Sequence, residues 1–214
     1  MNTRMIKVNP FDPEERLIWE AADVLGKGGV IGYPTETVYG LGADAYNDEA
    51  LEKLFQIKGR EVGKPISILI GTMDMLEEVT ARVPPLAVGL IQGHWPGPLT
   101  IIFEASKMCP PTLTGNSGKI GVRISPNPIV QKLLEAFKRP LTSTSANFSG
   151  MPSLSDPHEL YRAFRGRIDL IIDGGKTEGE AVSTVIDVTV SPPRVVREGV
   201  VKLEDANWGA QDES

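Results

Sequence analysis

Short apolar runs alternate with amphipathic segments along most of this chain, and this alternation limits the possible folds more than any other feature. Apolar residues recur at helical spacing, which predicts helices at 12–25, 47–59, 84–95, 127–139 and 156–167. Apolar runs bounded by Gly or Pro predict strands at 29–35, 65–70, 98–105, 119–125, 140–147, 168–173, 183–189 and 193–199. Helices that alternate with strands indicate an α/β fold.

Several predicted strands follow one another without a helix, after Gly97 and again from Ile168 onward. We therefore expect a twisted, mixed, open sheet with flanking helices instead of a regular βαβ series. The 214 residues fit a single domain. We expect that domain to span 13–203, with 1–12 as an N-terminal segment and 204–214 as a polar, acidic tail that frays.

Charge and cysteine content exclude several classes of protein. The net charge of -6 argues against extended electrostatic binding of nucleic acid, although it is compatible with a local basic pocket. Cys109 is the single cysteine, so we expect no internal disulfide and no cysteine metal site. His94 and His158 lie far apart and predict no metal site. The N-terminus lacks an apolar signal core and no stretch approaches ~18 apolar residues, so we expect a cytoplasmic protein without membrane contact.

The common nucleotide and nucleophile motifs are not present in the sequence. The tripeptide Gly175-Lys176-Thr177 imitates the end of a phosphate-binding P-loop, but Leu170 stands where that motif needs its first glycine. A solvated turn is the better interpretation of this segment. The chain also has no G-x-G-x-x-G between a strand and a helix, and no G-x-S-x-G nucleophile elbow.

Cations and small polar residues instead gather next to the predicted strands. Lys58, Arg60 and Lys64 fall within seven residues, between a helix and a strand. Hydroxyl, amide and arginine side chains occupy other strands or their ends: Thr35, Thr37, Arg123, Ser143, Thr144, Ser145, Asn147, Ser183, Thr184 and Arg197. Each alone is more often a cap, a turn residue or a surface ion pair. Together they predict a site at the strand ends for an anionic ligand that also carries hydrogen-bonding groups.

Six segments in order resemble the YrdC-type threonylcarbamoyl-AMP synthases: "YPTETVYGLGADA", "IKGREVGKPISILI", "GKIGVRISPNP", "TSTSANFSG", "STVIDV" and "VVREGV". The resemblance covers roughly 13–203. It implies a YrdC-like twisted sheet with a large concave face for nucleotide and amino acid. It also implies a nucleotidyltransferase that makes threonylcarbamoyl-AMP and pyrophosphate from L-threonine, bicarbonate and ATP. Longer members carry an additional C-terminal domain, which we do not expect in this chain.

The resemblance also implies roles for individual residues. Lys58 and Arg60 form the K-x-R pair, expected to be catalytic and to face the ATP phosphates. The other ATP contacts that it implies are Lys64, Asn147, Ser155 and Arg197. The threonine contacts that it implies are Thr35, Thr37, Arg123, Ser145 and Ser183. Mg²⁺ is expected to arrive with the triphosphate, without a metal site on the protein. Two positions depart from the family: Glu61 replaces a common Pro, and Leu69 replaces a common His.

The mechanism that we expect has no side-chain nucleophile. Threonine's amine adds to bicarbonate or CO₂, and the resulting carbamate attacks the α-phosphorus of ATP. Positioning and preformed positive charge would then supply the catalysis. A downstream threonylcarbamoyl-transferase complex would move the group onto tRNA. Two alternatives stay open: a non-catalytic tRNA-binding YrdC-like module, and a related carbamoyl-adenylate enzyme such as the longer, cysteine-bearing hydrogenase-maturation carbamoyltransferases.

Overall fold

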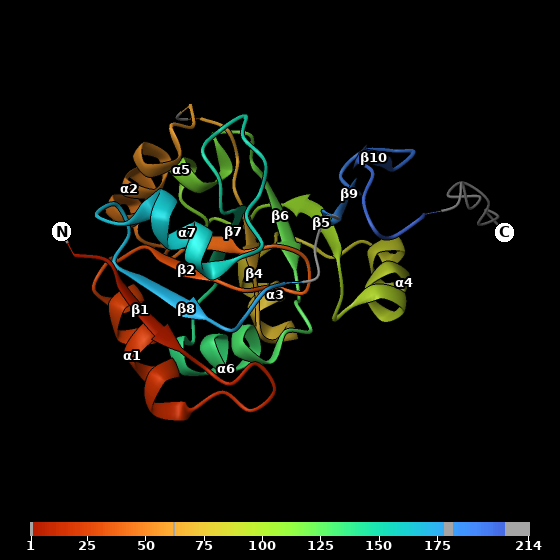
Figure 1. Ribbon diagram of the computed structural model, residues 1–214. Helices are drawn as coiled ribbons and strands as arrows, with labels where there is room; N and C mark the ends of the chain where they lie inside the picture. The colour runs from red at the N-terminus through yellow and green to blue at the C-terminus, as the bar shows by residue number, and fades with distance from the viewer. Residues whose placement is uncertain (1, 62, 178–181, 204–214) are drawn as a thin grey trace, which may run out of the picture.

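A computed structural model describes residues 2–61, 63–177 and 182–203. Their strands join in one sheet with the order β1-β8-β2-β3-β7-β4-β6-β5-β9-β10 (Figure 1). The strands are β1 Arg4–Lys7, β2 Ile31–Tyr33, β3 Gly40–Gly42, β4 Ser67–Leu69, β5 Leu99–Glu104, β6 Lys119–Arg123, β7 Leu141–Ser145, β8 Leu170–Asp173, β9 Thr184–Asp187 and β10 Arg194–Arg197. The helices are α1 Glu15–Gly26, α2 Asp48–Lys58, α3 Met73–Val79, α4 Pro85–His94, α5 Pro111–Thr114, α6 Pro128–Phe137 and α7 Pro157–Phe164.

The sheet is mixed, as the sequence predicted. The pairs β1–β8, β8–β2, β4–β6 and β5–β9 are parallel, and the remaining neighbours are antiparallel. Every parallel pair joins strands that are not consecutive in the chain, whereas the consecutive neighbours β2–β3, β5–β6 and β9–β10 are antiparallel. The α/β class and the single mixed sheet with flanking helices are therefore confirmed.

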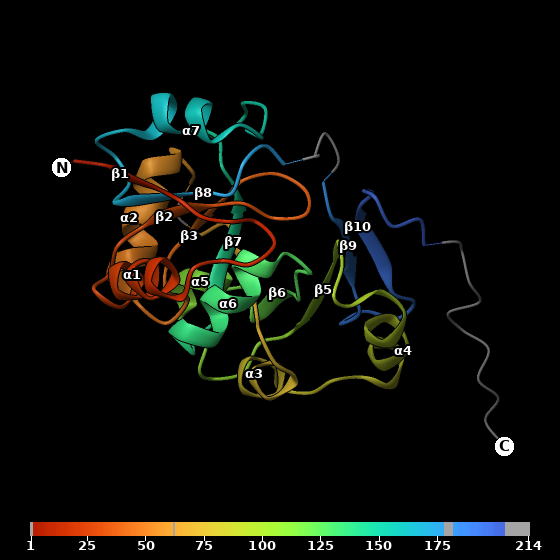
Figure 2. The same ribbon diagram turned by 60° about the horizontal axis from the view of Figure 1, so that its bottom comes forward.

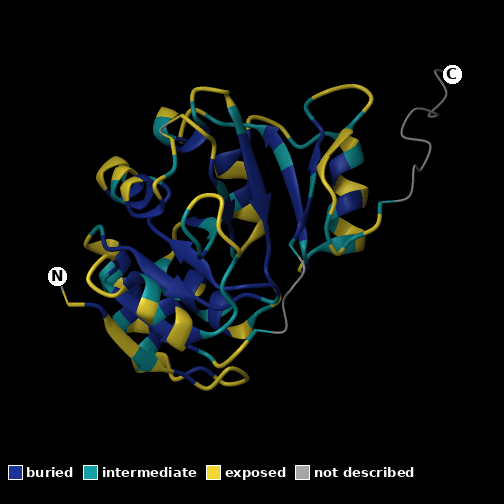
Figure 3. Cartoon of the chain, turned by 45° about the horizontal axis from the view of Figure 1, so that its top comes forward, coloured by how far each residue is buried: buried dark blue, intermediate teal, exposed yellow. Residues whose placement is uncertain are grey.

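Helices cover both faces of the sheet. The helices α1 and α6 lie side by side on one face (Figure 2), where Ile18 and Leu133 share a buried cluster with Leu170 of β8. On the other face, apolar side chains of α2 and α7 join a second cluster with the neighbouring strands. The inner strands and the inward faces of the helices are accordingly buried, while the outward faces of the helices are exposed (Figure 3), as are the edge strands β1 and β10 for the most part. No helix among the described residues is both long and apolar enough to cross a lipid bilayer.

The structure differs from the sequence prediction at several places. Strand β1 lies within the segment 1–12 that we expected outside the domain, and it pairs with β8. Helix α1 begins at Glu15 instead of Asp12, because the side chain of Asn9 accepts hydrogen bonds from the backbone N–H groups of Phe11 and Asp12 and holds them in a turn. The sequence prediction also missed β3, α3 and α5, which have three, seven and four residues. The acidic tail 204–214 lies outside the described residues.

Candidate functional site

One face of the sheet changes from apolar to polar along β4 and β7. Leu69 pairs with Leu141, and both are fully buried in the cluster that α1 and α6 cover. Residues two apart on a strand share a face, so the next pair on this face is Ser67 with Ser143. These short polar side chains do not fill the space above them. A cavity with a volume of about 210 Å³ lies over this part of the sheet.

Strand register carries further polar side chains to the same cavity. Thr100 of β5 pairs with Val185 of β9, which in turn pairs with Arg197 of β10, and all three residues line the cavity. Arg123, at the end of β6, lies beside Leu69 in the register. Arginines distant in sequence are therefore brought together by the pairing of their strands.

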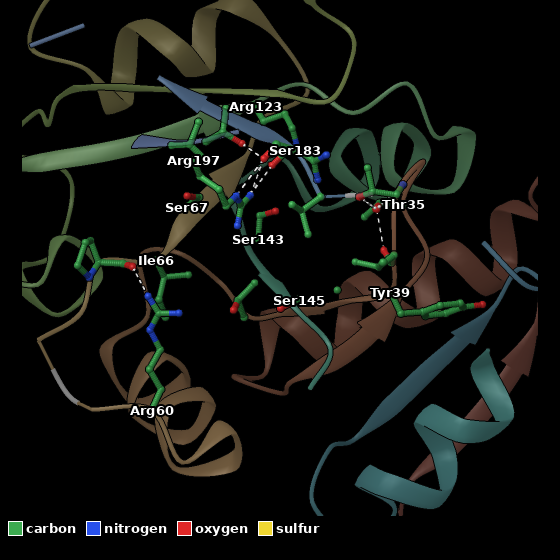
Figure 4. A pocket seen from close by; sticks show the side chains of 18 residues that line it. Thr35, Tyr39, Arg60, Ile66, Ser67, Arg123, Ser143, Ser145, Ser183 and Arg197 are labelled. Carbon is green, nitrogen blue, oxygen red and sulfur yellow. Dashed lines mark hydrogen bonds between the residues drawn. The ribbon is translucent and has the colours of Figure 1, made fainter. Parts of the chain in front are cut away.

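Three arginines line this cavity: Arg60, Arg123 and Arg197 (Figure 4). No acidic side chain is among the described residues that line it. Burial and the neighbouring charge of Arg123 lower the pKa of Arg197. Guanidinium groups stay protonated despite such shifts, so the cavity presents positive charge to its contents.

Hydroxyl groups occupy the rest of the polar wall. The hydroxyl of Thr35 donates to the carbonyl of Val38 at 2.7 Å and lies 2.9 Å from the hydroxyl of Thr37. These two contacts fix the loop between β2 and β3. The hydroxyl of Ser183 lies 3.2 Å from that of Thr100 and accepts from Nη2 of Arg197 at 2.9 Å. These contacts hold the hydroxyl groups in fixed positions.

Arg60 enters the cavity from the turn that ends α2. Gly59 adopts a φ of 58°, a left-handed conformation that ends the helix and redirects the chain. Nη2 of Arg60 donates to the carbonyl of Pro65 at 2.8 Å, whereas its Nε is buried without a hydrogen-bond partner among the described residues. Buried donors are normally satisfied, so this nitrogen is a candidate contact for a ligand oxygen. Burial also lowers the pKa of Arg60.

A second hollow of about 440 Å³ adjoins the first. Arg60, Thr144 and Ser145 line both cavities. Its other polar lining residues include Lys58, Lys64 and Asn147. Together the two cavities form a site with a hydroxyl- and arginine-lined end and a basic, more open end.

Lys58 is 3% exposed, and its ammonium group is held by the loop that follows β7. Its Nζ donates to the carbonyl of Ser145, to the carbonyl of Asn147 at 3.1 Å and to Oδ1 of Asn147 at 2.8 Å. The three protons of an ammonium group match these three acceptors. In this structure Lys58 therefore holds the loop, and its ammonium group has no further donor for a phosphate.

The charge of Lys58 is expected to make activity depend on pH. Burial, and to a smaller extent the positive charge of Arg60, lowers the pKa of Lys58 from 10.5 to about 8. The lysine loses its proton, and its hold on the loop weakens, as pH rises through that value. We expect the ratio of wild-type to Lys58→Met kcat/KM for ATP to fall above pH 8. Using this ratio cancels the ionisation of the substrates.

Unfolding does not explain such a fall. Between about 8 and 10.5 the unfolded chain keeps a proton that the folded chain has lost, so this group makes the free energy of unfolding rise with pH. Melting temperatures recorded over the same range serve as the control. A ratio that stays constant from pH 7 to 9.5 would contradict the role assigned to the charge.

The predicted residues fall into three groups. The first cavity is lined by Thr35, Thr37, Arg60, Arg123, Ser145, Ser183 and Arg197. The second is lined by Lys58, Arg60, Lys64, Ser145 and Asn147, and Lys64 also forms an exposed ion pair with Glu61 at 2.9 Å. Ser155 lines neither cavity, and its carbonyl accepts from the N–H of Thr177 at 3.0 Å. Leu69 is fully buried beneath α1 and α6 and is not a lining residue.

The sequence prediction missed several residues of the site and its support, among them Ser67, Thr100 and Glu36. Ser67 and Thr100 line the first cavity, and Glu36 accepts a hydrogen bond from Arg123. A polar residue that interrupts an apolar strand is a signal that could have identified Ser67 and Thr100. No local pattern in the sequence identifies Glu36, because its partner Arg123 lies on a strand that is distant in the sequence. No group of three His, Cys, Asp or Glu side chains suited to a metal ion occurs among the described residues.

Comparisons with known proteins point to one family. The Sua5/YciO/YrdC family model, described as "Telomere recombination", matches residues 23–199. A threonylcarbamoyl-AMP synthase of Pyrococcus abyssi is 40% identical over 192 residues, which cover 90% of this chain and 56% of that protein. The structure of P. abyssi Sua5 complexed with L-threonine has a TM-score of 0.88 at 39% identity and covers 91% of this chain and 57% of that one. The structure of YciO from Escherichia coli has a TM-score of 0.87 at 35% identity and covers 94% and 97%.

Proposed function

Because this chain belongs to the Sua5/YciO/YrdC family, we propose that it is an L-threonylcarbamoyladenylate synthase, a nucleotidyltransferase. It would form threonylcarbamoyl-AMP and pyrophosphate from L-threonine, bicarbonate and ATP, for threonylcarbamoyladenosine modification of tRNA. The observation that supports this best is the meeting of two cavities at Arg60, Thr144 and Ser145. One cavity suits a small hydroxy-amino acid, and the other suits a polyanion.

Similarity alone does not select this activity. The chain spans 56% of the length of the P. abyssi synthase, so that protein has parts that this chain does not match. The match to the E. coli relative YciO covers 94% of the length of YciO, and that protein is described as uncharacterized. The side chains of the site therefore decide which activity is proposed.

The proposed arrangement places each substrate by charge. The triphosphate would lie along Arg60 and Lys64 of the second cavity and reach Arg197 of the first, and these cations would neutralise the charge that builds on the phosphoryl oxygens and on the pyrophosphate leaving group. Asn147 of the second cavity would contact the nucleotide, and the nucleotide contact assigned to Ser155 stays a prediction.

The amino acid would occupy the hydroxyl-lined cavity. The guanidinium of Arg123 would bind its carboxylate, while the hydroxyl groups of the wall orient its side chain: Thr35, Thr37, Ser145 and Ser183. The amine would then add to bicarbonate or CO₂, and the carbamate oxygen would attack the α-phosphorus. The chain's contribution is orientation and fixed positive charge.

Mg²⁺ is proposed to enter with ATP. The described residues include no cluster of carboxylates or imidazoles at the site, and Glu61 already pairs with Lys64. Mg²⁺ commonly binds through substrate phosphates and water, which suits such a site. When bound it would neutralise part of the triphosphate charge.

Pyrophosphate release tests the proposal. We expect release only when ATP, L-threonine and bicarbonate are all present, and a large loss when any one is omitted. Release that does not depend on threonine would contradict it. Turnover with carbamoyl phosphate in place of threonine and bicarbonate would favour the related carbamoyl-adenylate activity. Salt-sensitive tRNA binding without pyrophosphate release would favour the non-catalytic module.

A further inference from the structure

Arg123 forms a buried ion pair with a residue that the proposed mechanism does not use. Arg123 is 4% exposed, and its Nη1 donates to Oε1 of Glu36 at 2.5 Å. The side chain of Glu36 is 17% exposed, and Glu36 lines neither of the two cavities. The carboxylate therefore lies behind the arginine instead of competing for the cavity.

The second oxygen of Glu36 is tied to the start of α6. Oε2 accepts from the hydroxyl of Ser125 at 2.5 Å, and Ser125 is fully buried. The same hydroxyl accepts from the N–H of Asn127, whose side chain caps α6, and the carbonyl of Ser125 accepts from Gln131 of that helix. The carboxylate is thus fixed to a helix whose apolar face is packed on the sheet.

We propose that Glu36 is a positioning residue that holds the guanidinium of Arg123 in the orientation needed to bind a carboxylate of the amino-acid substrate. This inference rests on the proposed function. A planar guanidinium binds a carboxylate through two parallel hydrogen bonds only if its plane and edge are correctly directed. Glu36 engages one edge, at Nη1, which leaves the remaining donors for the cavity.

The negative charge of Glu36 also stabilises Arg123 electrostatically. Arg123 lies close enough to Arg197 for its charge to lower the pKa of Arg197. A neighbouring carboxylate offsets this repulsion and keeps Arg123 at its place at the end of β6. Without Glu36, Arg123 would be a buried cation without its counter-charge, and we expect it to move.

The test uses Glu36→Gln and Glu36→Ala in the full chain, with KM for L-threonine and for ATP measured by pyrophosphate release. Glutamine keeps the shape and one acceptor but removes the charge. We expect KM for L-threonine to rise about tenfold in Glu36→Gln and more in Glu36→Ala, with KM for ATP within about twofold of wild type. Calorimetric titration of L-threonine into each protein gives the same comparison without turnover.

Ser125→Ala and a double-mutant cycle separate positioning from a purely structural role. If Glu36 acts through Arg123, Glu36→Gln combined with Arg123→Met should be no worse than Arg123→Met alone. Ser125→Ala should give a smaller rise in the same KM. If Glu36→Ala does not fold, Glu36→Gln decides.

Each outcome has one meaning. Equal changes in both KM values, additive effects in the cycle, or a Glu36→Gln variant identical to wild type would overturn the inference while the synthase proposal stands. A wild-type protein that neither binds L-threonine nor releases pyrophosphate would overturn both.

Discussion

Replacement of Arg60 with alanine is expected to lower threonine-dependent pyrophosphate release by about 100-fold or more. Arg60 lies where the two cavities meet, and its buried Nε has no partner among the described residues. An oxygen of the triphosphate would satisfy this donor as charge develops in the transition state. Loss of one preorganised donor of this kind costs about 2–4 kcal/mol of transition-state stabilisation.

Steady-state assays with saturating threonine and bicarbonate measure this effect. Arg82→Ala is the matched control, because Arg82 pairs with Glu104 at 3.2 Å in an exposed surface ion pair away from both cavities. The control should keep wild-type activity, since exposed ion pairs contribute little. A decrease of less than a few-fold for Arg60→Ala, with an unchanged melting temperature, would remove Arg60 from the mechanism.

The second large effect is expected at Lys58, and its signature is non-additivity. Lys58→Met keeps most of the side-chain volume but removes the three hydrogen bonds that hold Ser145 and Asn147. We expect kcat/KM to fall by about 100-fold, because charge-assisted hydrogen bonds of a buried cation are lost together with the position of the loop. Asn147→Ala should lower kcat/KM through the same loop.

The double variant distinguishes holding the loop from direct contact with phosphate. If Lys58 acts through Asn147, Lys58→Met with Asn147→Ala should be within about threefold of the worse single variant. Independent contacts with ATP would instead multiply the two effects. That second result would return Lys58 to the phosphate-facing role that the family resemblance implies.

Much of the fold was predictable because it depends on local patterns. The helix at 127–139 combined an Asn start with a regular apolar face, and α6 occupies almost that range. The strand β1 was not predictable in the same way, since its sequence "RMIK" is short and largely exposed and becomes a strand only by pairing with β8.

The candidate site was predictable as a set of residue types, but not as a set of contacts. Arg123 and Arg197 could be chosen as cations on strands, yet their proximity follows from a register that local sequence does not specify. Glu36 was missed for that reason. Whether Leu69, in place of the family's common His, affects the amino-acid pocket was left open by the sequence, and its pairing with Leu141 buries it beneath α1 and α6.

The fate of labelled bicarbonate tests the proposed synthase activity most directly. The protein is incubated with ATP, L-threonine and carbon-13-labelled bicarbonate. The products are then separated, and their masses are measured by mass spectrometry. We expect an adenylate that contains both threonine and the labelled carbon, formed together with pyrophosphate. Pyrophosphate or ADP without a labelled adenylate, from a folded protein that binds ATP, would contradict the proposed activity.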